Sequence, residues 1–177
     1  LAGRSQSGGS TQSEGAVRDV RIGIVSDIHG NAAGLATALA LMGDVDELLC
    51  AGDMVEEYRF SNDTVAMLRE REARCVLGNH DLGSQPLAID TVVHGHRLVL
   101  THASPCAPHT QYVMPHSPEL KRIAGVDADL VVIGHTHKQM VTRVGRPLVV
   151  NPGSAGQARD HSNAKRLSFA VLDLSAE

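Results

Sequence analysis

The stretch ARCVLGNHD, residues 73–81, sets polar side chains directly behind an apolar run. Val76 and Leu77 have the character of the end of a buried strand, and Gly78 permits a sharp exit from it. An amide, an imidazole and a carboxylate then follow in succession at residues 79–81. This succession of three such groups at one strand tip raises the question of what chemistry they serve.

Metal-compatible side chains follow four other expected strands in the same way. The residues at these five strand ends are Asp27, His29, Asp53, Asn79, His80, His102, His135 and His137. Each alone is a weak signal, because an aspartate after a strand is often a turn former or a helix cap. In α/β sheets, however, the carboxyl ends of the strands face one crevice, where ligands gather. The five strand ends together therefore predict a metal site.

Working outward from these tips, apolar periodicity predicts alternating strands and helices in the first half of the chain. The expected elements are strands over 20–25, 46–51 and 73–77 and helices over 31–43 and 61–73. Gly43 is expected to end the first helix, and Ser61 or Asn62 to cap the second. A βαβαβ order implies a parallel sheet with right-handed crossovers.

The second half is richer in strands with short connectors. Strand-like runs lie at 91–102 (two short strands around His94-Gly95, or a hairpin), 129–135, 139–145, 147–151 and 166–174, with a short helix at 118–125. We expect these strands to pair largely as hairpins. The predicted fold class is α/β (α+β), with two mixed β-sheets packed as a sandwich and flanked by helices. Residues 1–17, rich in Ser, Gly and Gln, are expected to form a flexible tail before one domain over 18–177.

Composition excludes several classes of function. The net charge of −4 gives no basic field for a nucleic-acid or anionic-membrane partner. No apolar run approaches the ~20 residues of a membrane span, and no signal-peptide pattern is present. The three cysteines lack metal-binding spacing, and Cys50 and Cys75 fall within apolar runs typical of buried thiols. We therefore expect a cytoplasmic protein.

The motifs in this order resemble the calcineurin-like metallophosphoesterase superfamily, in particular its small bacterial phosphoesterase branch. The segments that carry the resemblance are DIHGN (27–31), GD (52–53), GNHD (78–81), THASP (101–105), GHTH (134–137) and VNPGS (150–154). The resemblance covers residue 21 to about residue 160. It implies a double β-sandwich flanked by helices.

The resemblance also implies a dinuclear metal centre. One ion would be held by Asp27, His29, Asp53 and His137, and the second by Asp53, Asn79, His102 and His135, so that the Asp53 carboxylate bridges them. Nitrogen and oxygen ligands suit Mn²⁺, which we expect, and also Fe, Zn²⁺ or Ni²⁺. Two divalent ions against two carboxylates and one hydroxide leave a net positive site, which attracts a phosphate dianion.

The implied activity is hydrolysis of phosphomonoesters or phosphodiesters on small or nucleotide-type substrates. A hydroxide bridging the two ions would be the nucleophile. His80 would stabilise phosphoryl charge and protonate the leaving oxygen. The segment between GNHD and His102 is too short for a large cap domain, so we expect an open cleft and a small phosphorylated substrate.

Other residues near the motifs have less certain roles. Asp81 either caps the local backbone or supports a metal-binding histidine, and capping is favoured. Glu56 is expected to orient His80. Glu57 stands where phosphoprotein phosphatases carry a phosphate-binding arginine, which disfavours a dedicated protein phosphatase. Arg159 either contacts phosphate or is a plain surface residue.

Further polar residues are expected to play structural roles. Asn151 and Gly153 are expected to shape a turn under the metal loops. The remaining histidines are expected on the surface or in loops: His94, His96, His109, His116 and His161.

Three alternatives remain open from the sequence. One is a non-catalytic protein-binding scaffold of the same fold, like the retromer subunit that lacks the catalytic histidine. The others are a phosphoprotein phosphatase and a nuclease acting on long DNA. The presence of His80 and of all seven expected ligands favours the phosphoesterase, and the sequence gives no oligomeric state.

Overall fold

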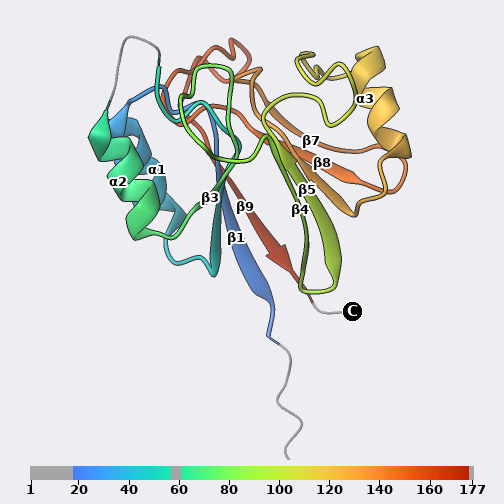
Figure 1. The fold of residues 1–177 in the computed structure, drawn as a ribbon, viewed down its shortest axis with the longest axis horizontal. Coiled ribbons are helices and arrows are strands. Elements are labelled where there is room, and N and C mark those ends of the chain that lie inside the picture. Colours follow the sequence, from blue (N-terminus) through green and yellow to red (C-terminus); the bar gives the residue numbers. More distant parts are fainter. Residues whose placement is uncertain (1–17, 57–60, 176–177) are drawn as a thin grey trace, which may run out of the picture.

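The computed structural model describes residues 18–56 and 61–175, which form two β-sheets packed face to face (Figure 1). The first sheet has the order β3-β2-β1-β9, and the second has the order β4-β5-β6-β8-β7. The predicted fold class is confirmed. The predicted tail at 1–17 lies outside the described residues.

The first half of the chain follows the predicted βαβαβ order. Its elements are β1 (Val20–Val25), α1 (Ala32–Met42), β2 (Glu47–Cys50), α2 (Asn62–Glu70) and β3 (Arg74–Cys75). The Asn31 side chain caps α1 by accepting from the Gly34 N–H, and Ser61 caps α2 in the same way. Strand β3 is shorter than expected, because the Leu77 N–H turns away to donate to the Pro86 carbonyl.

The second half contains more parallel pairing than the sequence suggested. Its elements are β4 (Ala88–Val93), β5 (His96–Thr101), α3 (Pro118–Arg122), a 3₁₀ turn (Ile123–Gly125), β6 (Leu130–Val132), β7 (Gln139–Arg143), β8 (Leu148–Pro152) and β9 (Ala170–Leu174). Hairpins join β4 to β5 and β7 to β8, but β5, β6 and β8 run parallel. The expectation of pairing largely by hairpins was therefore wrong for the centre of this sheet. Strand β9 also leaves it and pairs antiparallel with β1 of the first sheet.

The main core lies between the two sheets and is built from aliphatic side chains. Ile22, Ile24 and Leu49 of the first sheet pack with Leu98, Leu100, Val132 and Val150 of the second, and all seven are fully buried. Helices α1 and α2 cover the outer face of the first sheet, while α3 covers the second (Figure 1). This sandwich holds the strand tips rigidly at one end. In the described ranges, none of the helices has the length and apolar character needed to cross a bilayer.

Candidate metal centre

The predicted ligands meet at one end of the sandwich, where strands from both sheets finish (Figure 1). Strands β1, β2 and β3 bring them from the first sheet, and β5 and β6 from the second. Strand β4 runs antiparallel to β5 and brings none of them. The centre therefore joins the two sheets.

Backbone hydrogen bonds fix the loops at this end to one another. The Asp27 N–H donates to the Gly52 carbonyl at 3.0 Å, and the His29 N–H donates to the Asp53 carbonyl at 2.9 Å. The Gly134 N–H donates to the His102 carbonyl at 2.8 Å. These bonds tie the loop after β1 to the loop after β2, and the loop after β6 to the loop after β5.

Glycine is required where these loops touch. A Cβ on Gly78 would collide with the Asp53 carboxylate, and one on Gly134 would collide with the Ser26 hydroxyl. Both glycines directly precede a candidate ligand. The close approach that they allow brings Asn79 and His135 toward the aspartates.

The backbone at the centre is unusually strained. Five candidate ligands adopt the left-handed conformation that favours glycine, with φ between 48° and 66°: Asp27, His29, Asp53, His135 and His137. Such conformations persist in non-glycine residues only when the surroundings enforce them. The surrounding hydrogen bonds therefore place these side chains at a cost in conformational free energy.

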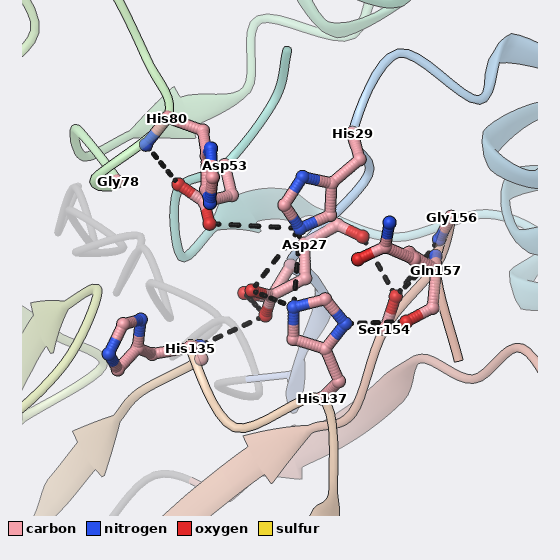
Figure 2. Close-up of polar contacts among 12 residues, drawn as sticks. Asp27, His29, Asp53, Gly78, His80, His135, His137, Ser154, Gly156 and Gln157 are labelled. Atoms are coloured by element: carbon pink, nitrogen blue, oxygen red, sulfur yellow. Dashed lines mark hydrogen bonds and ion pairs between the residues drawn. The ribbon is translucent and has the colours of Figure 1, made fainter. Parts of the chain in front are cut away.

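The first set of ligand atoms gathers around Asp27 (Figure 2). The Nε2 atoms of His29 and His137 lie 3.2 Å apart, and His137 Nε2 lies 3.2 Å from Asp27 Oδ1. His137 donates through Nδ1 to the Gln157 carbonyl, so in the neutral ring its Nε2 carries a lone pair. Asp27 Oδ1 is buried without a hydrogen-bond partner. A buried, unpaired carboxylate oxygen facing imidazole lone pairs is the environment that a cation completes.

The second set gathers around His102. Its Nδ1 donates to the Ala51 carbonyl at 2.7 Å, so Nε2 faces the centre. That Nε2 lies 3.0 Å from Asn79 Oδ1, 3.1 Å from His135 Nδ1 and 3.3 Å from Asp53 Oδ2. One proton on Nε2 can satisfy only one of these acceptors, whereas a cation among them can satisfy all four atoms.

Asp53 links the two sets. Its Oδ2 lies near His102 Nε2 and also 3.7 Å from His29 Nε2 of the first set. Ligand atoms sharing one ion at bond lengths of about 2.1 Å are roughly 3.0–3.4 Å apart, which the separations within each set approach. The residues present therefore fit two divalent ions that share the Asp53 carboxylate.

The charges at the centre shift several pKa values. Burial lowers the pKa of His29, and burial together with the neighbouring His102 lowers the pKa of His135 to about 4. Burial acts to lower the pKa of His102 as well, but its contact with Asp53 raises it overall. For Asp53, burial acts to raise the pKa, but the contact with His102 lowers it overall. The lowered pKa values of His29, His135 and Asp53 favour the neutral histidines and the ionised aspartate that bind metals, whereas the raised pKa of His102 favours its protonated form in the metal-free protein.

His80 adjoins His29 of the first set and Asp53, which the two sets share. Its backbone N–H donates to Asp53 Oδ1 at 2.9 Å (Figure 2). Its half-buried ring meets the His29 ring edge-on, with centroids 5.2 Å apart. One of its ring nitrogens lies within 4.8 Å of ligand atoms of His29 and Asp53. This position lets His80 face a group bound at the metals.

Asp81 caps the backbone, as favoured from the sequence. One carboxylate oxygen accepts from the Gly78 N–H at 2.9 Å, and the other accepts from the Val55 N–H at 3.0 Å. Asp81 thus ties the loop after β3 to the loop after β2.

Glu56 and Arg159 lie on the His29 side of the centre. Glu56 lines a hollow with His29 and Gln157, and among the described residues no hydrogen bond or ion pair joins it to His80. Its role in orienting His80 stays a prediction. Exposed Arg159 donates to the Gln157 side chain, and the Gln157 carbonyl in turn accepts from His137 of the first ligand set. The contact of Arg159 with phosphate also stays a prediction. Glu57 lies outside the described residues.

The turn at 150–154 supports the ligand loops, as expected. The Asn151 amide donates to the Gly134 carbonyl at 2.7 Å, and its oxygen accepts from the Gly153 N–H at 2.9 Å. The five other histidines lie outside both ligand sets and are exposed or half-buried: His94, His96, His109, His116 and His161.

Three supporting residues were missed from the sequence. Ser26 donates to Asp27 Oδ2 at 2.6 Å, and Ser154 donates to the Asp27 carbonyl at 2.8 Å. The Tyr112 ring stacks on the His135 ring, with centroids 4.0 Å apart. Ser154 stood in a segment that carried the resemblance and could have been singled out there. Tyr112 had no such signal, because its loop carries no recognisable motif.

Comparison with known proteins identifies one family. The profile of the calcineurin-like phosphoesterase superfamily domain matches residues 20–177. A conserved Streptococcus pneumoniae protein, described as a predicted phosphoesterase, is 23% identical with a TM-score of 0.67, over 90% of this chain and 86% of that one. A metallophosphoesterase from Sphaerobacter thermophilus is 22% identical with a TM-score of 0.66, over 88% of this chain and 84% of that one. Wild-type Vps29 from Entamoeba histolytica, solved in complex with Zn²⁺, is 19% identical with a TM-score of 0.63, over 89% and 87% of the two chains.

Proposed function

Because the chain belongs to the calcineurin-like phosphoesterase superfamily, we propose that it hydrolyses phosphomonoesters or phosphodiesters of small or nucleotide-type molecules. The resemblance found in its motifs is confirmed at the level of the superfamily. The catalytic activity and its substrates are our proposal.

One observation carries this proposal. Two sets of inward-facing nitrogen and oxygen atoms share the Asp53 carboxylate at the meeting point of both sheets. A purely structural polar cluster would pair its acceptors with donors, yet Asp27 Oδ1 is buried with no hydrogen bond. The donor set therefore supports a dinuclear centre.

The residues at the centre would divide the work as follows. Asp27, His29 and His137 would hold one ion, while Asn79, His102 and His135 would hold the other, with Asp53 between them. Bound divalent ions lower the pKa of a water held between them and neutralise phosphoryl charge. His80, beside both sets, would donate a hydrogen bond to the phosphoryl group and a proton to the departing oxygen.

We propose Mn²⁺ as the preferred ion. Four imidazole nitrogens together with two carboxylates and one amide suit borderline ions better than strongly hydrated Mg²⁺. Fe, Zn²⁺ and Ni²⁺ fit the same ligands. The three cysteines are free thiols, which supports our proposal of a cytoplasmic location.

A non-catalytic scaffold is the second candidate, because Vps29 shares the fold. Two features of this chain favour catalysis over that alternative. His80 is present with its ring edge-on to the His29 ring, and each residue proposed as a ligand has an atom near another atom of its set. The negative net charge likewise supports a small phosphorylated substrate over nucleic acid.

The test is a metal-reconstitution assay. Protein stripped with a chelator is refilled with Mn²⁺ or Mg²⁺, bound metal is quantified, and hydrolysis of p-nitrophenyl phosphate and bis(p-nitrophenyl) phosphate is followed. We expect Mn²⁺ to restore turnover and Mg²⁺ to do so weakly. Asp53→Asn protein purified in parallel is the control, because turnover that remains in it measures the contribution of contaminating phosphatases. Two bound ions without turnover of either ester would overturn the hydrolase and favour the scaffold.

A further inference from the structure

A cavity of about 420 Å³ opens beside the second ligand set. Asn79, His102 and His135 form one end of its wall. The lining includes His102 and His135 of the second set but none of Asp27, His29 and His137, so the cavity opens on the side of the second set. A group bound at the metals could extend directly into it.

The rest of the cavity wall is largely apolar. Leu77, Leu87, Ala88, Val99, Ala103 and Pro105 supply most of it. Leu87 is 75% exposed at the mouth, where an apolar ligand group would shield it from water. The volume of the cavity falls within the range of pockets that enclose an organic ligand. Thr101, His109 and Thr110 also line the cavity, but apolar residues form most of the wall away from the three proposed ligands, and this part suits an apolar group.

The hollow on the opposite side of the centre has a different character. It has a volume of about 340 Å³ and is lined by His29, Asn31, Glu56 and Gln157 among others. An apolar group placed there would strip water from an amide and a carboxylate without replacing their hydrogen bonds. The cavity beside His102 is the better place for such a group.

We propose that this cavity binds the organic group of the phosphoester, and that this group is apolar and about the size of a ring. The inference rests on the proposed function for its phosphoryl site and goes beyond it by assigning the substrate class. The phosphoryl group would lie at the metals, while an aryl or comparable apolar group packs against Leu87 and Val99.

Binding of two phosphonates tests the proposal without requiring turnover. Phenylphosphonate and methylphosphonate carry the same phosphoryl group and differ only in the organic substituent. A buried phenyl ring removes on the order of 100 Å² of apolar surface from water, so we expect at least about tenfold tighter binding of phenylphosphonate. Titration calorimetry on the Mn²⁺-loaded protein gives both dissociation constants.

Two variants locate the ring. Leu87→Ser removes an apolar side chain at the mouth, and Val99→Thr replaces a methyl group of the wall by a hydroxyl at nearly constant shape. Each should reduce the preference for phenylphosphonate by about threefold or more while leaving methylphosphonate binding unchanged. Leu41→Ser is the matched control, because Leu41 is 73% exposed on α1 and lies outside the cavity. Its preference should equal that of the wild type.

The outcomes separate the two proposals. Equal affinity for the two phosphonates, or a preference that neither cavity variant reduces, overturns the assignment of the cavity even if the protein hydrolyses nitrophenyl esters. A clear phenyl preference that depends on Leu87 or Val99, in a protein without turnover, supports the cavity and refutes the hydrolase. Binding of neither phosphonate overturns both.

Discussion

Replacing Asp53 by asparagine should separate metal binding from fold stability. The Asp53 side chain is 2% exposed, and its Oδ1 accepts from the His80 N–H at 2.9 Å. An asparagine oxygen can keep that bond. Its NH₂ group then takes the place of Oδ2, which lies 3.3 Å from His102 Nε2 and 3.7 Å from His29 Nε2. An amide nitrogen carries no available lone pair, so both ligand sets lose their shared oxygen.

The expected magnitudes follow from these contacts. Altering a residue that merely supports a metal ligand typically costs 10–100-fold in affinity, and removing a shared charged ligand should cost at least about 100-fold for each ion. In the metal-free protein the substitution removes both a buried charge and its contact with His102. These effects oppose one another, and His102 can release its proton once the Asp53 charge is gone, so no unpaired charge stays buried. The free energy of unfolding should therefore change by no more than about 1 kcal/mol, below the roughly 3–5 kcal/mol expected when a buried charge loses its partner.

Asp81→Asn is the matched control, because Asp81 uses both oxygens to accept backbone N–H groups, from Gly78 and Val55. Asparagine has one acceptor oxygen, so one of these N–H groups would face an NH₂ group instead. We expect a loss of about 1–3 kcal/mol in the free energy of unfolding, with both metal ions retained.

The assay combines atomic emission measurement of bound metal, calorimetric titration of the stripped proteins and urea unfolding in chelator. The reasoning is refuted if Asp53→Asn holds two ions with wild-type affinity. It is also refuted if the two variants exchange behaviour, so that Asp81→Asn loses metal and Asp53→Asn loses stability.

Three other predictions concern His80, Tyr112 and His135. His80→Ala should keep both ions but lose roughly 10²–10⁴-fold in rate on alkyl or nucleoside phosphates, and clearly less on nitrophenyl esters, because their leaving group needs no proton. Steady-state rates and metal content are measured on the same samples. Equal losses on the two substrate types would show that His80 does not act as an acid. Tyr112→Ala should weaken binding of the second ion about tenfold because His135 loses its stacking partner, whereas Tyr112→Phe should not, as calorimetry can show. In the metal-free protein the pKa of His135 is lowered to about 4. As the pH falls from about 7 toward 4, His135 therefore binds a proton in the unfolded chain but stays neutral in the folded protein, which lowers the free energy of unfolding. Urea unfolding should therefore show the free energy of unfolding falling over this pH window by about 1–2 kcal/mol more in the wild type than in His135→Gln, after a reduction for solvent screening. The same pH dependence of stability in both proteins would contradict this.

The first half of the fold was predictable because its signals are local. Apolar runs of strand length alternate with an Ala- and Leu-rich helix and a second helix capped by Ser61, and short crossovers impose parallel pairing. The candidate ligands were predictable for the same reason. Each follows a strand, and the ends of parallel strands meet at one edge.

The pairing of the second half was not predictable, because it depends on contacts distant in sequence. Strands β5 and β6 pair in parallel across the connection that includes α3, and nothing local distinguishes this from two hairpins. Strand β9 bypasses its neighbours in sequence to pair with β1, about 150 residues earlier. The periodicity of a strand records which face is buried and not which partner it takes.

At the site, the residue types were predictable from the sequence, but not which atom of each histidine faces the centre. His29, His102 and His137 turn Nε2 toward the centre, whereas His135 turns Nδ1. That choice is set by backbone carbonyls of Ala51 and Gln157, which hold the opposite ring nitrogen of His102 and His137. Such second partners lie far away in sequence and become visible only in the folded structure.

The left-handed backbone at five candidate ligands has a consequence for how this chain changes over evolutionary time. Each non-glycine residue held in that conformation costs roughly 1 kcal/mol, so the five together cost about 5 kcal/mol, which equals the whole stability of a weakly stable domain. A lineage released from the need to bind metal could recover much of this free energy by accepting glycine at these positions, one substitution at a time. This chain keeps an aspartate or a histidine at all five. The strain at these five positions is therefore a stability cost that this chain bears for side chains that glycine could not supply.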